Sequence, residues 1–298
     1  MMRTMGEHSL LIDNISLLLS KLDLNDDYIQ LTSSQINEMA ETYSMFNNIK
    51  KILVIGAHKE YSIIRRLPNN LTHLLFYDGC SYNYDLCDIL PDTLEQLRLS
   101  WNYNHKFKRW PNNLKELSLG YSYNIELSDL PSLKYLKLGS SYNYPLYNLP
   151  DTLEVLILGG FYDKEILECM LPYGLKYLDL GYSYNIQLPI LPDGIEYFRL
   201  SDFYMKKLPK LPSSLKYFEI GNKYLYRLDD NELPNSLEIL KLGDLYNFKL
   251  PKLPGNLKQL LLGDNYDYEL DINNLPKTLK HIQVSTNYRY KVPYLPIK

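Results

Sequence analysis

The chain has 298 residues, of which 45% are hydrophobic and 22% are charged, and its formal net charge at pH 7 is only -3. A charge this close to neutral creates no strong field for nucleic acid or a membrane surface, so we expect neither as a partner. Three Cys residues without a CxxC pair make neither a disulfide framework nor a metal site, and we expect no metal and no cofactor.

The N-terminal part differs from the rest in charge. Residues 1–50 carry three Lys or Arg against seven Asp or Glu, whereas the remainder is balanced at 29 against 28. Apolar residues recur here at the spacing of one helix face: Leu11, Ile15, Leu18 and Leu22. The run is too short and too polar to span a bilayer and lacks the order of a signal peptide, so we expect a cytoplasmic protein. Ser33 or Ser34 is placed to cap a further helix that runs to about Phe46.

From residue 49 onward the sequence repeats. A Leu-Pro or Trp-Pro dipeptide recurs every 19 to 23 residues, with its proline at positions 68, 91, 111, 131, 150, 172, 192, 212, 234, 254, 276 and 296. Nearly every proline is followed by Leu-x-x-Leu-x-Leu and then Gly or Ser, as in "LPDTLEQLRLS". A degenerate first copy is readable in "NIKKILVIG" at 48–56. Repetition at this period indicates a solenoid of stacked coils.

Each copy predicts one coil. Leu-x-Leu alternates with period two, as in a strand with one buried face, and Gly or Ser then allows a turn. Proline fixes φ and suits a corner rather than a helix interior. We therefore predict a right-handed, leucine-rich-repeat-like solenoid of about 11–12 coils of 20–22 residues. One long parallel sheet would run along a rod of about 50 Å at about 4.8 Å per strand.

Two further columns recur in register and predict structural ladders. Tyr stands four residues after the last apolar strand position in ten consecutive copies: Tyr103, Tyr123, Tyr142, Tyr162, Tyr184, Tyr204, Tyr224, Tyr246, Tyr266 and Tyr288. A side chain repeated in every coil is expected in the interior. The Asn or Asp that follows it in most copies is expected to hydrogen-bond neighbouring turns.

The phrase Tyr-Asn-x-x-Leu-x-x-Leu-Pro-x-x-Leu-x-x-Leu-x-Leu-Gly resembles the FNIP repeat, a relative of the leucine-rich repeat. Copies such as "YNIQLPILPDGIEYFRLS" and "YNFKLPKLPGNLKQLLLG" carry the resemblance, which covers residues 67 to 298. Such repeats occur in social amoebae and in giant DNA viruses of amoebae. For a viral protein the resemblance implies residence in the host cytoplasm and a host-virus interaction.

In such viral proteins the repeats often follow an F-box, which docks onto a ubiquitin-ligase adaptor. Residues 10–46 resemble one in part, with "LDLNDDYIQL" in the place of its acidic turn and second helix. The resemblance then implies adaptor contacts by Leu11, Ile15, Leu18 and Leu22. The usual early Leu-Pro is missing. A helical cap of residues 1–48, followed by a solenoid at 49–298, is the other interpretation.

The strand positions that point away from the core are not forced to repeat. In the middle coils they form an aromatic and aliphatic column beside a charged one: Tyr135, Lys137, Val155, Tyr177, Asp179, Tyr197, Arg199, Tyr217, Glu219, Ile239 and Lys241. We expect them on the exposed face of the sheet. Tyr and Arg together are typical of protein-interface anchors, so this face is the candidate partner site. The alternative is that the tyrosines merely stiffen the sheet.

No catalytic constellation is recognisable. The five His residues lie far apart in different repeat registers, and neither a phosphate loop nor a nucleophile motif is present. We expect a non-catalytic scaffold that binds a protein of unknown identity. A substrate receptor that reaches a ubiquitin-ligase adaptor through residues 1–48 and a glycan-binding repeat protein are the alternatives.

Overall fold

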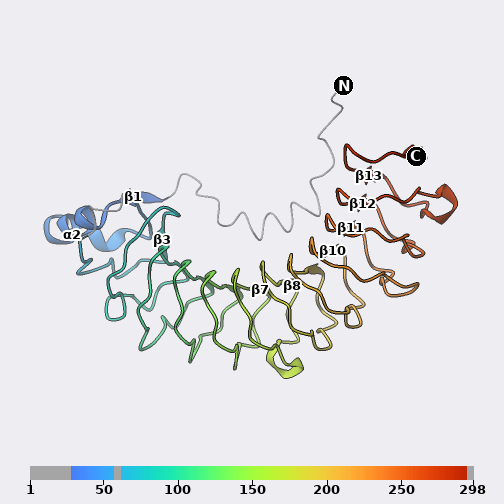
Figure 1. Ribbon diagram of the computed structural model, residues 1–298. Coiled ribbons are helices and arrows are strands. Elements are labelled where there is room, and N and C mark those ends of the chain that lie inside the picture. The colour runs from blue at the N-terminus through green and yellow to red at the C-terminus, as the bar shows by residue number, and fades with distance from the viewer. Residues whose placement is uncertain (1–27, 57–61, 294–298) are drawn as a thin grey trace.

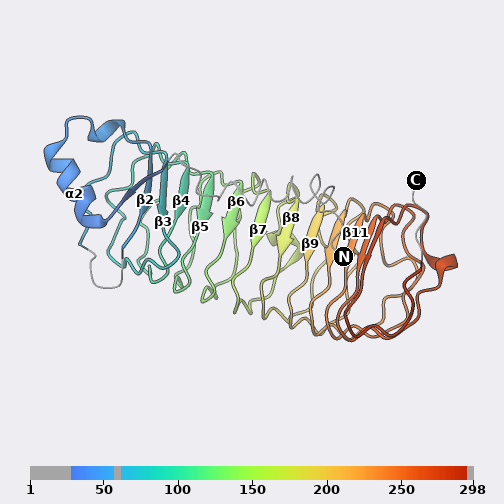
Figure 2. The same ribbon diagram turned by 90° about the horizontal axis from the view of Figure 1, so that it is seen from above.

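The computed structural model describes residues 28–56 and 62–293, and it shows a curved solenoid with one parallel sheet along its concave side (Figure 1). Within these residues, thirteen short strands lie side by side in chain order, as Figure 2 shows from above. They are β1 (Ile29–Leu31), β2 (Lys51–Val54), β3 (His73–Phe76), β4 (Gln96–Arg98), β5 (Glu116–Ser118), β6 (Tyr135–Lys137), β7 (Val155–Ile157), β8 (Tyr177–Asp179), β9 (Tyr197–Arg199), β10 (Tyr217–Glu219), β11 (Ile239–Lys241), β12 (Gln259–Leu261) and β13 (His281–Gln283). The leucine-rich-repeat-like coil is thus confirmed.

The N-terminal end is built from one strand and one short helix. β1 pairs in parallel with β2, and α2 (Ser33–Thr42) follows it directly. Thr32 caps the helix by accepting a hydrogen bond from the Gln35 N–H at 3.2 Å, so the cap is neither Ser33 nor Ser34. The helix ends at Thr42, and a short 3-10 helix, η1 (Phe46–Asn48), follows. A helix here was expected, but Ile29–Leu31 is a strand where the F-box resemblance implied a second helix.

Along each internal strand, core-facing and outward-facing residues alternate with period two. Leu136 of β6 is fully buried, and the next apolar position, Leu138, is buried as well. The strands pair in one constant register, so that Leu136 lies between Leu117 and Leu156. Each coil therefore adds the same layer of Leu, Ile or Phe to one continuous core. The remaining short helices, η2 (Glu168–Met170) and η3 (Ile272–Asn274), lie in the segments of variable length opposite the sheet.

The tyrosine column is part of this core, as expected. From Tyr103 to Tyr266 every member is buried. The rings lie within 16° of parallel in the pairs Tyr103 and Tyr123, Tyr142 and Tyr162, and Tyr162 and Tyr184. Several hydroxyl groups accept a hydrogen bond at 3.1–3.4 Å from a backbone N–H of the preceding coil, for example Tyr204 from Leu188 and Tyr246 from Leu228. One side chain thus fills the interior and satisfies a buried donor. Because burial disfavours the phenolate, the pKa of Tyr142 rises to about 12.

The asparagine column also forms a ladder. The Oδ1 atoms of Asn83, Asn104, Asn124 and Asn143 each accept a hydrogen bond from the backbone N–H one coil further on, at 3.0–3.1 Å. The amide therefore ties consecutive turns together at the exposed edge of the coil. This confirms the structural interpretation of the column.

Where a glycine follows a strand, as at Gly139, it has a reason that the sequence did not indicate. A Cβ atom added at Gly139 would lie 1.9 Å from the carbonyl oxygen of Gly120 in the preceding coil. Glycine is thus required because two backbones touch, and the turn that we expected from the sequence is not the main constraint.

The solenoid is curved into an arc, a feature that strand spacing alone did not indicate (Figure 1). On the concave face, the rings of Tyr197 and Tyr217 are 4.1 Å apart, centroid to centroid. Just inside the sheet, Phe198 and Phe218 are 5.5 Å apart. In the deeper ladder, Tyr142 and Tyr162 are 6.4 Å apart. Coils that repeat at a longer distance on one side must bend toward the other, which makes the sheet face concave.

We predict that Gly139→Ala lowers the free energy of unfolding by about 3 kcal/mol or more, since overpacking at this level forces backbone movement. Chemical denaturation followed by circular dichroism measures the change. Gly255→Ala is the matched control, because a Cβ there meets nothing within 4 Å. Equal stability of the two variants would contradict the close-packing explanation.

Candidate functional site

The structure places the eleven candidate residues on one surface. All belong to strands β6 to β11, and each is the first or third residue of its strand, so that all point away from the core. First-position residues pair with one another across neighbouring strands, as do third-position residues. The two columns therefore run side by side along the concave face, as the sequence predicted.

The first column is less exposed than expected. Tyr135, Val155 and Tyr177 form a hydrophobic cluster of their own, and their exposed fractions are only 7%, 3% and 6%. Ile239 is buried as well, and Tyr197 and Tyr217 are half-buried. The expectation of an exposed column was wrong for these four buried residues, because neighbouring side chains about 4.8 Å apart cover one another. The hydroxyl group of Tyr135 is buried as well.

Three tyrosines in this column are stacked. The ring centroids of Tyr177 and Tyr197 are 4.2 Å apart with an angle of 6° between the planes, and Tyr197 and Tyr217 are 4.1 Å apart at 9°. The Tyr217 hydroxyl donates a hydrogen bond to Glu219 Oε2 at 2.8 Å. Burial raises the pKa of all three hydroxyl groups, so the stack stays neutral at physiological pH. The result is a rigid aromatic strip.

The second column is a ladder of alternating charge. Arg199 Nη1 lies 3.2 Å from Asp179 Oδ1, and Arg199 Nε lies 3.5 Å from Glu219 Oε1. Lys241 Nζ reaches the same Glu219 oxygen at 2.9 Å. Arg199 also contacts Asp202 in the following turn at 3.3 Å. The charged side chains in this central part of the face therefore neutralise one another through ion pairs.

The pKa values of the two carboxyl groups in the ladder, Asp179 and Glu219, are shifted in opposite directions. Burial raises the pKa of Asp179 above its ordinary value, and the nearby Arg199 opposes this only in part. Burial acts the same way on Glu219, but hydrogen bonds from Lys241 and Tyr217, together with the charges of Lys241 and Arg199, leave its pKa lowered. Of the two carboxyl groups, Asp179 therefore depends more on its neighbouring cation, Arg199, to stay ionised.

Lys137 stands apart from this ladder. It is exposed, and its neighbours in the column are Ser118 on one side and Ile157 on the other. Burial of its stem and the charge of Arg98 lower the pKa of its ammonium group, whereas Asp179 raises it. Among the candidate residues, Lys137 is the cation most open to a partner.

The sequence interpretation missed an aromatic rim along the sheet. Trp101, Tyr121, Phe161, Tyr182 and Phe203 occupy the turns that follow strands β4, β5, β7, β8 and β9. Trp101, Phe161 and Tyr182 are exposed, and the Trp101 and Tyr121 rings are stacked 4.5 Å apart. The signal was present in the one or two residues before each ladder tyrosine. These positions vary from coil to coil, which hides them in a search for repetition.

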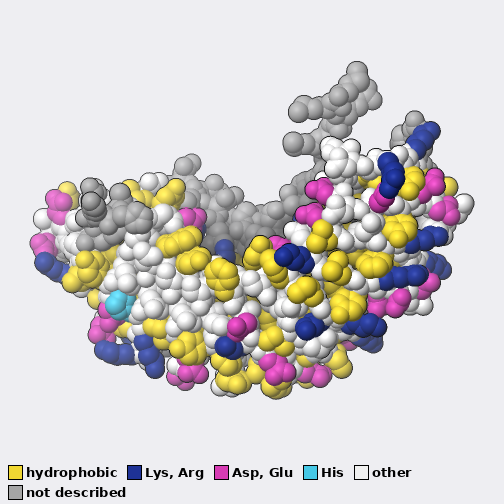
Figure 3. All heavy atoms as spheres, in the orientation of Figure 1, with side chains coloured by type: hydrophobic (Ala, Val, Ile, Leu, Met, Phe, Trp, Pro, Cys, Tyr) yellow, Lys and Arg dark blue, Asp and Glu magenta, His cyan; other side chains and the backbone are white. Residues whose placement is uncertain are grey.

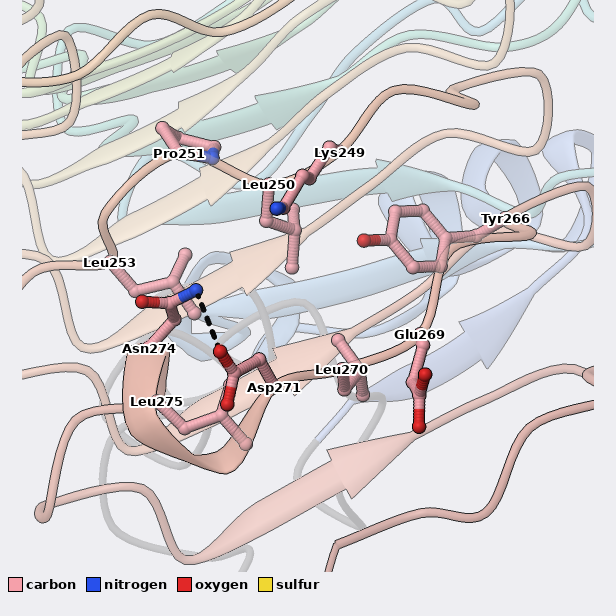
Figure 4. Close-up of a pocket in the computed structure, with 10 residues that line it drawn as sticks. All are labelled: Lys249, Leu250, Pro251, Leu253, Tyr266, Glu269, Leu270, Asp271, Asn274 and Leu275. Carbon is pink, nitrogen blue, oxygen red and sulfur yellow. Dashed lines mark hydrogen bonds between the residues drawn. The ribbon is translucent and has the colours of Figure 1, made fainter.

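Hollows on the opposite side offer little chemistry. The one drawn in Figure 4 has a volume of about 20 Å³, and it lies between coils that include Leu250, Tyr266 and Leu275. This is room for about one water molecule. A wider groove of about 800 Å³ beside it is lined partly by Asn231 of a turn and Asn273 of η3. In the residues that the structure describes, no cluster of three or more His, Cys, Asp or Glu is arranged to hold a metal ion.

The four residues assigned to an adaptor contact, Leu11, Ile15, Leu18 and Leu22, lie outside the described residues. Residues 28–48 are described, and they pack on the first coils: Ile36 and Phe46 are buried in the same core as Ile52. No helix of the described part is long and apolar enough to cross a membrane.

We predict that Arg199→Ala lowers the free energy of unfolding by about 3 kcal/mol, because it leaves Asp179 and Glu219 partly buried without their shared cation. Thermal and chemical denaturation measure the loss. Lys241→Ala is the matched control from the same column. Its side chain is 45% exposed against 26% for Arg199, so its loss should be below about 1 kcal/mol. A larger loss for Lys241→Ala would contradict this description of the ladder.

The same ladder predicts a pH dependence for Arg199→Met. Without the guanidinium, the pKa of Asp179, already raised in the folded state, rises further. A carboxyl whose folded pKa exceeds its unfolded pKa binds more protons when folded, so stability falls as pH rises through that range. We therefore expect the deficit of the variant relative to wild type to shrink between about pH 7 and about pH 5. A deficit that grows over this range would contradict the assignment to Asp179.

Comparison with known proteins agrees with this architecture. Residues 130–161, 162–203 and 246–287 match the family model of the FNIP repeat. CroV588 from the giant virus CroV, described as a circular leucine-rich-repeat protein, is similar in fold with a TM-score of 0.59 at 22% identity. The match covers 83% of this chain and 45% of that one, so this chain spans less than half of its length.

YopM from Yersinia enterocolitica WA-314 aligns over 82% of this chain and 66% of its own, with a TM-score of 0.46 and 22% identity. A search among proteins with curated descriptions finds no match to this chain. In the three matched segments, the repeat model and the coil geometry agree. The chain is a leucine-rich-repeat-like solenoid, and three of its segments match the FNIP repeat.

Proposed function

We propose that the chain is a non-catalytic scaffold whose concave face binds a protein partner. The observation that carries the proposal is the pairing of the stacked tyrosines 177, 197 and 217 with the charge ladder from Asp179 to Lys241. Both columns lie on the same strands, and the aromatic rim borders them. Tyr and Arg are enriched among the residues that dominate protein-protein binding energy.

Rigidity supports this proposal. Binding orders side chains at a cost of about 0.5–1.5 kcal/mol each when they are mobile in the free protein. Here stacking and ion pairs already fix Tyr197, Arg199 and Glu219, so little of that cost remains. The column could also be explained by sheet stiffening alone. Stiffening does not account for the exposed Lys137 or for the exposed aromatic residues of the rim.

The shape of the face favours a protein over a small ligand. The candidate residues extend over six neighbouring strands, β6 to β11. At about 4.8 Å per strand this is a surface about 25 Å long, the scale of a protein interface. A glycan-binding role has weaker support, because the widest aromatic faces of the strip are covered by stacking.

The adaptor-binding role of residues 1–48 has support from the sequence resemblance only. Residues 29–31 add a strand to the sheet, and Ile36 and Phe46 bury their side chains against the first coil. This use of residues 28–48 supports the cap interpretation for that part of the chain. A role as substrate receptor of a ubiquitin ligase would therefore have to rest on the residues before Tyr28.

Site-specific photo-crosslinking tests the concave-face proposal. A benzophenone amino acid at position 137 or 182 should yield covalent protein adducts in amoeba lysate. The same group at position 147 is the control, because Tyr147 is exposed in the segment opposite the sheet. Phe161→Ser combined with Tyr182→Ser should reduce the adduct at 137 by about tenfold, as expected for loss of hot-spot side chains. Since both side chains are exposed, the melting temperature should change little.

Adducts only at position 147, or equal yields at all three positions, would show that the concave face is not the partner site. Adducts that persist unchanged in the Phe161→Ser, Tyr182→Ser variant would remove the aromatic rim from the site.

A further inference from the structure

A short side chain interrupts the outward column of the sheet at one point. The third residues of neighbouring strands form this column, and Ser118 of β5 is the smallest among those of β4 to β13. It pairs with Arg98 of β4 on one side and with Lys137 of β6 on the other. Two long basic side chains therefore flank one short hydroxyl side chain. This arrangement differs from the ladder between Asp179 and Lys241, in which opposite charges alternate.

The same point holds a hydroxyl group without a hydrogen-bond partner. Tyr135, the first residue of β6, is only 7% exposed, and no described residue hydrogen-bonds to its buried hydroxyl oxygen. Burial raises the pKa of Tyr135 to about 12, whereas Ser118 and Arg98 act in the opposite direction. The phenol oxygen therefore lies near these two side chains, although it forms no hydrogen bond of normal geometry with Ser118. Buried hydroxyl groups usually have a partner, and an exception calls for an explanation.

Lys137 supplies a cation that its neighbours in the column do not neutralise. Its side chain is exposed, and the residues paired with it on both sides are uncharged. Asp179, two strands away, is already paired with Arg199. Burial of the Lys137 stem and, after it, the charge of Arg98 lower the pKa of the ammonium group. The two cations thus lie close enough to repel each other, and an anion bound between them would relieve this repulsion.

Arg98 already has one acidic partner but keeps further donors. Its Nη2 atom contacts Asp78, whose side chain is 79% exposed, and a guanidinium group has five N–H donors in all. Glu116, which pairs with Tyr135 in the first column, accepts a hydrogen bond from Gln96 at 3.0 Å. Acidic and basic side chains are also interspersed over the face of the molecule drawn in Figure 3. Attraction for an anion here therefore comes from donors that converge on one point and not from an excess of positive charge.

The spacing of the two cations suits one oxyanion. Arg98 and Lys137 are two strands apart, so their backbones are about 10 Å apart at about 4.8 Å per strand. A carboxylate or phosphoryl group that accepts hydrogen bonds of about 2.8 Å on two opposite sides needs donors about 8 Å apart. Both side chains are long enough to close this difference by leaning toward Ser118. Because Lys137 is exposed, its side chain can move aside and let a ligand reach the Tyr135 hydroxyl.

We propose that the polar side chains around Ser118 form a binding site for an oxyanion on a side chain of the protein partner. The site consists of Arg98, Ser118, Tyr135 and Lys137. The oxyanion is a carboxylate or a phosphoryl group, whose oxygen atoms can accept hydrogen bonds from several donors at once. The two cations hold its charge, and the two hydroxyl groups donate to it. The site belongs to the concave face, so its role in the cell rests on the proposed function, whereas its affinity for small anions does not.

Capped amino acids test the site on the full chain without any partner. The probes are N-acetyl-phosphoserine methylamide and N-acetyl-glutamate methylamide, and the neutral N-acetyl-glutamine methylamide is their control. Saturation-transfer NMR measures the affinity of each probe. In protein with carbon-13-labelled lysine, the Lys137 signal is identified by its absence in Lys137→Gln, and it should shift with a charged probe but not with the neutral one. The charged probe that binds more tightly identifies the oxyanion as phosphoryl or carboxylate.

Two variants separate this site from general charge attraction. Lys137→Gln should weaken binding of the charged probe by about tenfold. Tyr135→Phe should weaken it by about fivefold through loss of one hydrogen bond. The melting temperature of Tyr135→Phe should not fall, because the hydroxyl that it removes has no partner in the free chain. Lys210→Gln is the matched control, since Lys210 is an exposed residue of another coil.

Failure of both charged probes to shift the Lys137 signal would overturn the proposal. So would an equal loss of affinity in Lys210→Gln, or an unchanged affinity in Tyr135→Phe. Crosslinking at position 137 tests the proposed function independently. Adducts without probe binding would remove only the oxyanion site, and probe binding without adducts would remove only the partner.

Discussion

Neighbouring coils of this solenoid are held at different distances on their two sides, and the remaining geometry depends on that difference. The sheet hydrogen bonds fix the concave side, where stacked rings are 4.1–4.2 Å apart. The interior tyrosine ladder fixes the deeper layer at 6.2–6.4 Å. The contact between Gly139 and the Gly120 carbonyl shows how closely the turns next to the sheet approach each other. The curvature thus follows from the different sizes of the side chains that set the spacing between coils at the sheet and in the interior.

Curvature in turn makes the candidate face. Because the sheet lies on the inner side of the arc, side chains that point out of it are pressed toward one another. The aromatic side chains on this face stack, as Tyr177, Tyr197 and Tyr217 do. The charged side chains form ion pairs, which join Asp179, Arg199, Glu219 and Lys241. Such a surface is ordered before any partner arrives. A straight array of the same strands would leave these side chains more room and a larger entropy to lose on binding.

Tyrosine has two structural roles in this chain, and register separates them. The ladder tyrosines such as Tyr204 and Tyr246 lie inside the coil, where the hydroxyl accepts a hydrogen bond from a buried backbone N–H. The strand tyrosines such as Tyr197 lie outside this core, at the first position of a strand and half-buried on the concave side of the sheet. The composition, with 29 Tyr, does not distinguish these roles. The position within the repeat does, since one register recurs in ten consecutive coils, whereas among the described strands the other occurs in β6, β8, β9 and β10.

The sequence by itself determined the repeat, the strand positions, the alternation of buried and outward residues, and both ladders. These follow from local spacing, because each coil contacts only its neighbours and every coil meets the same surroundings. Only the tertiary structure decided the curvature, the burial of Tyr135, Val155, Tyr177 and Ile239, and the aromatic rim around the face. It also showed that Ile29–Leu31 is a strand that pairs with the first coil. These features depend on distances between coils and on what covers the ends of the stack, and neither quantity is present in the spacing of residues along one repeat.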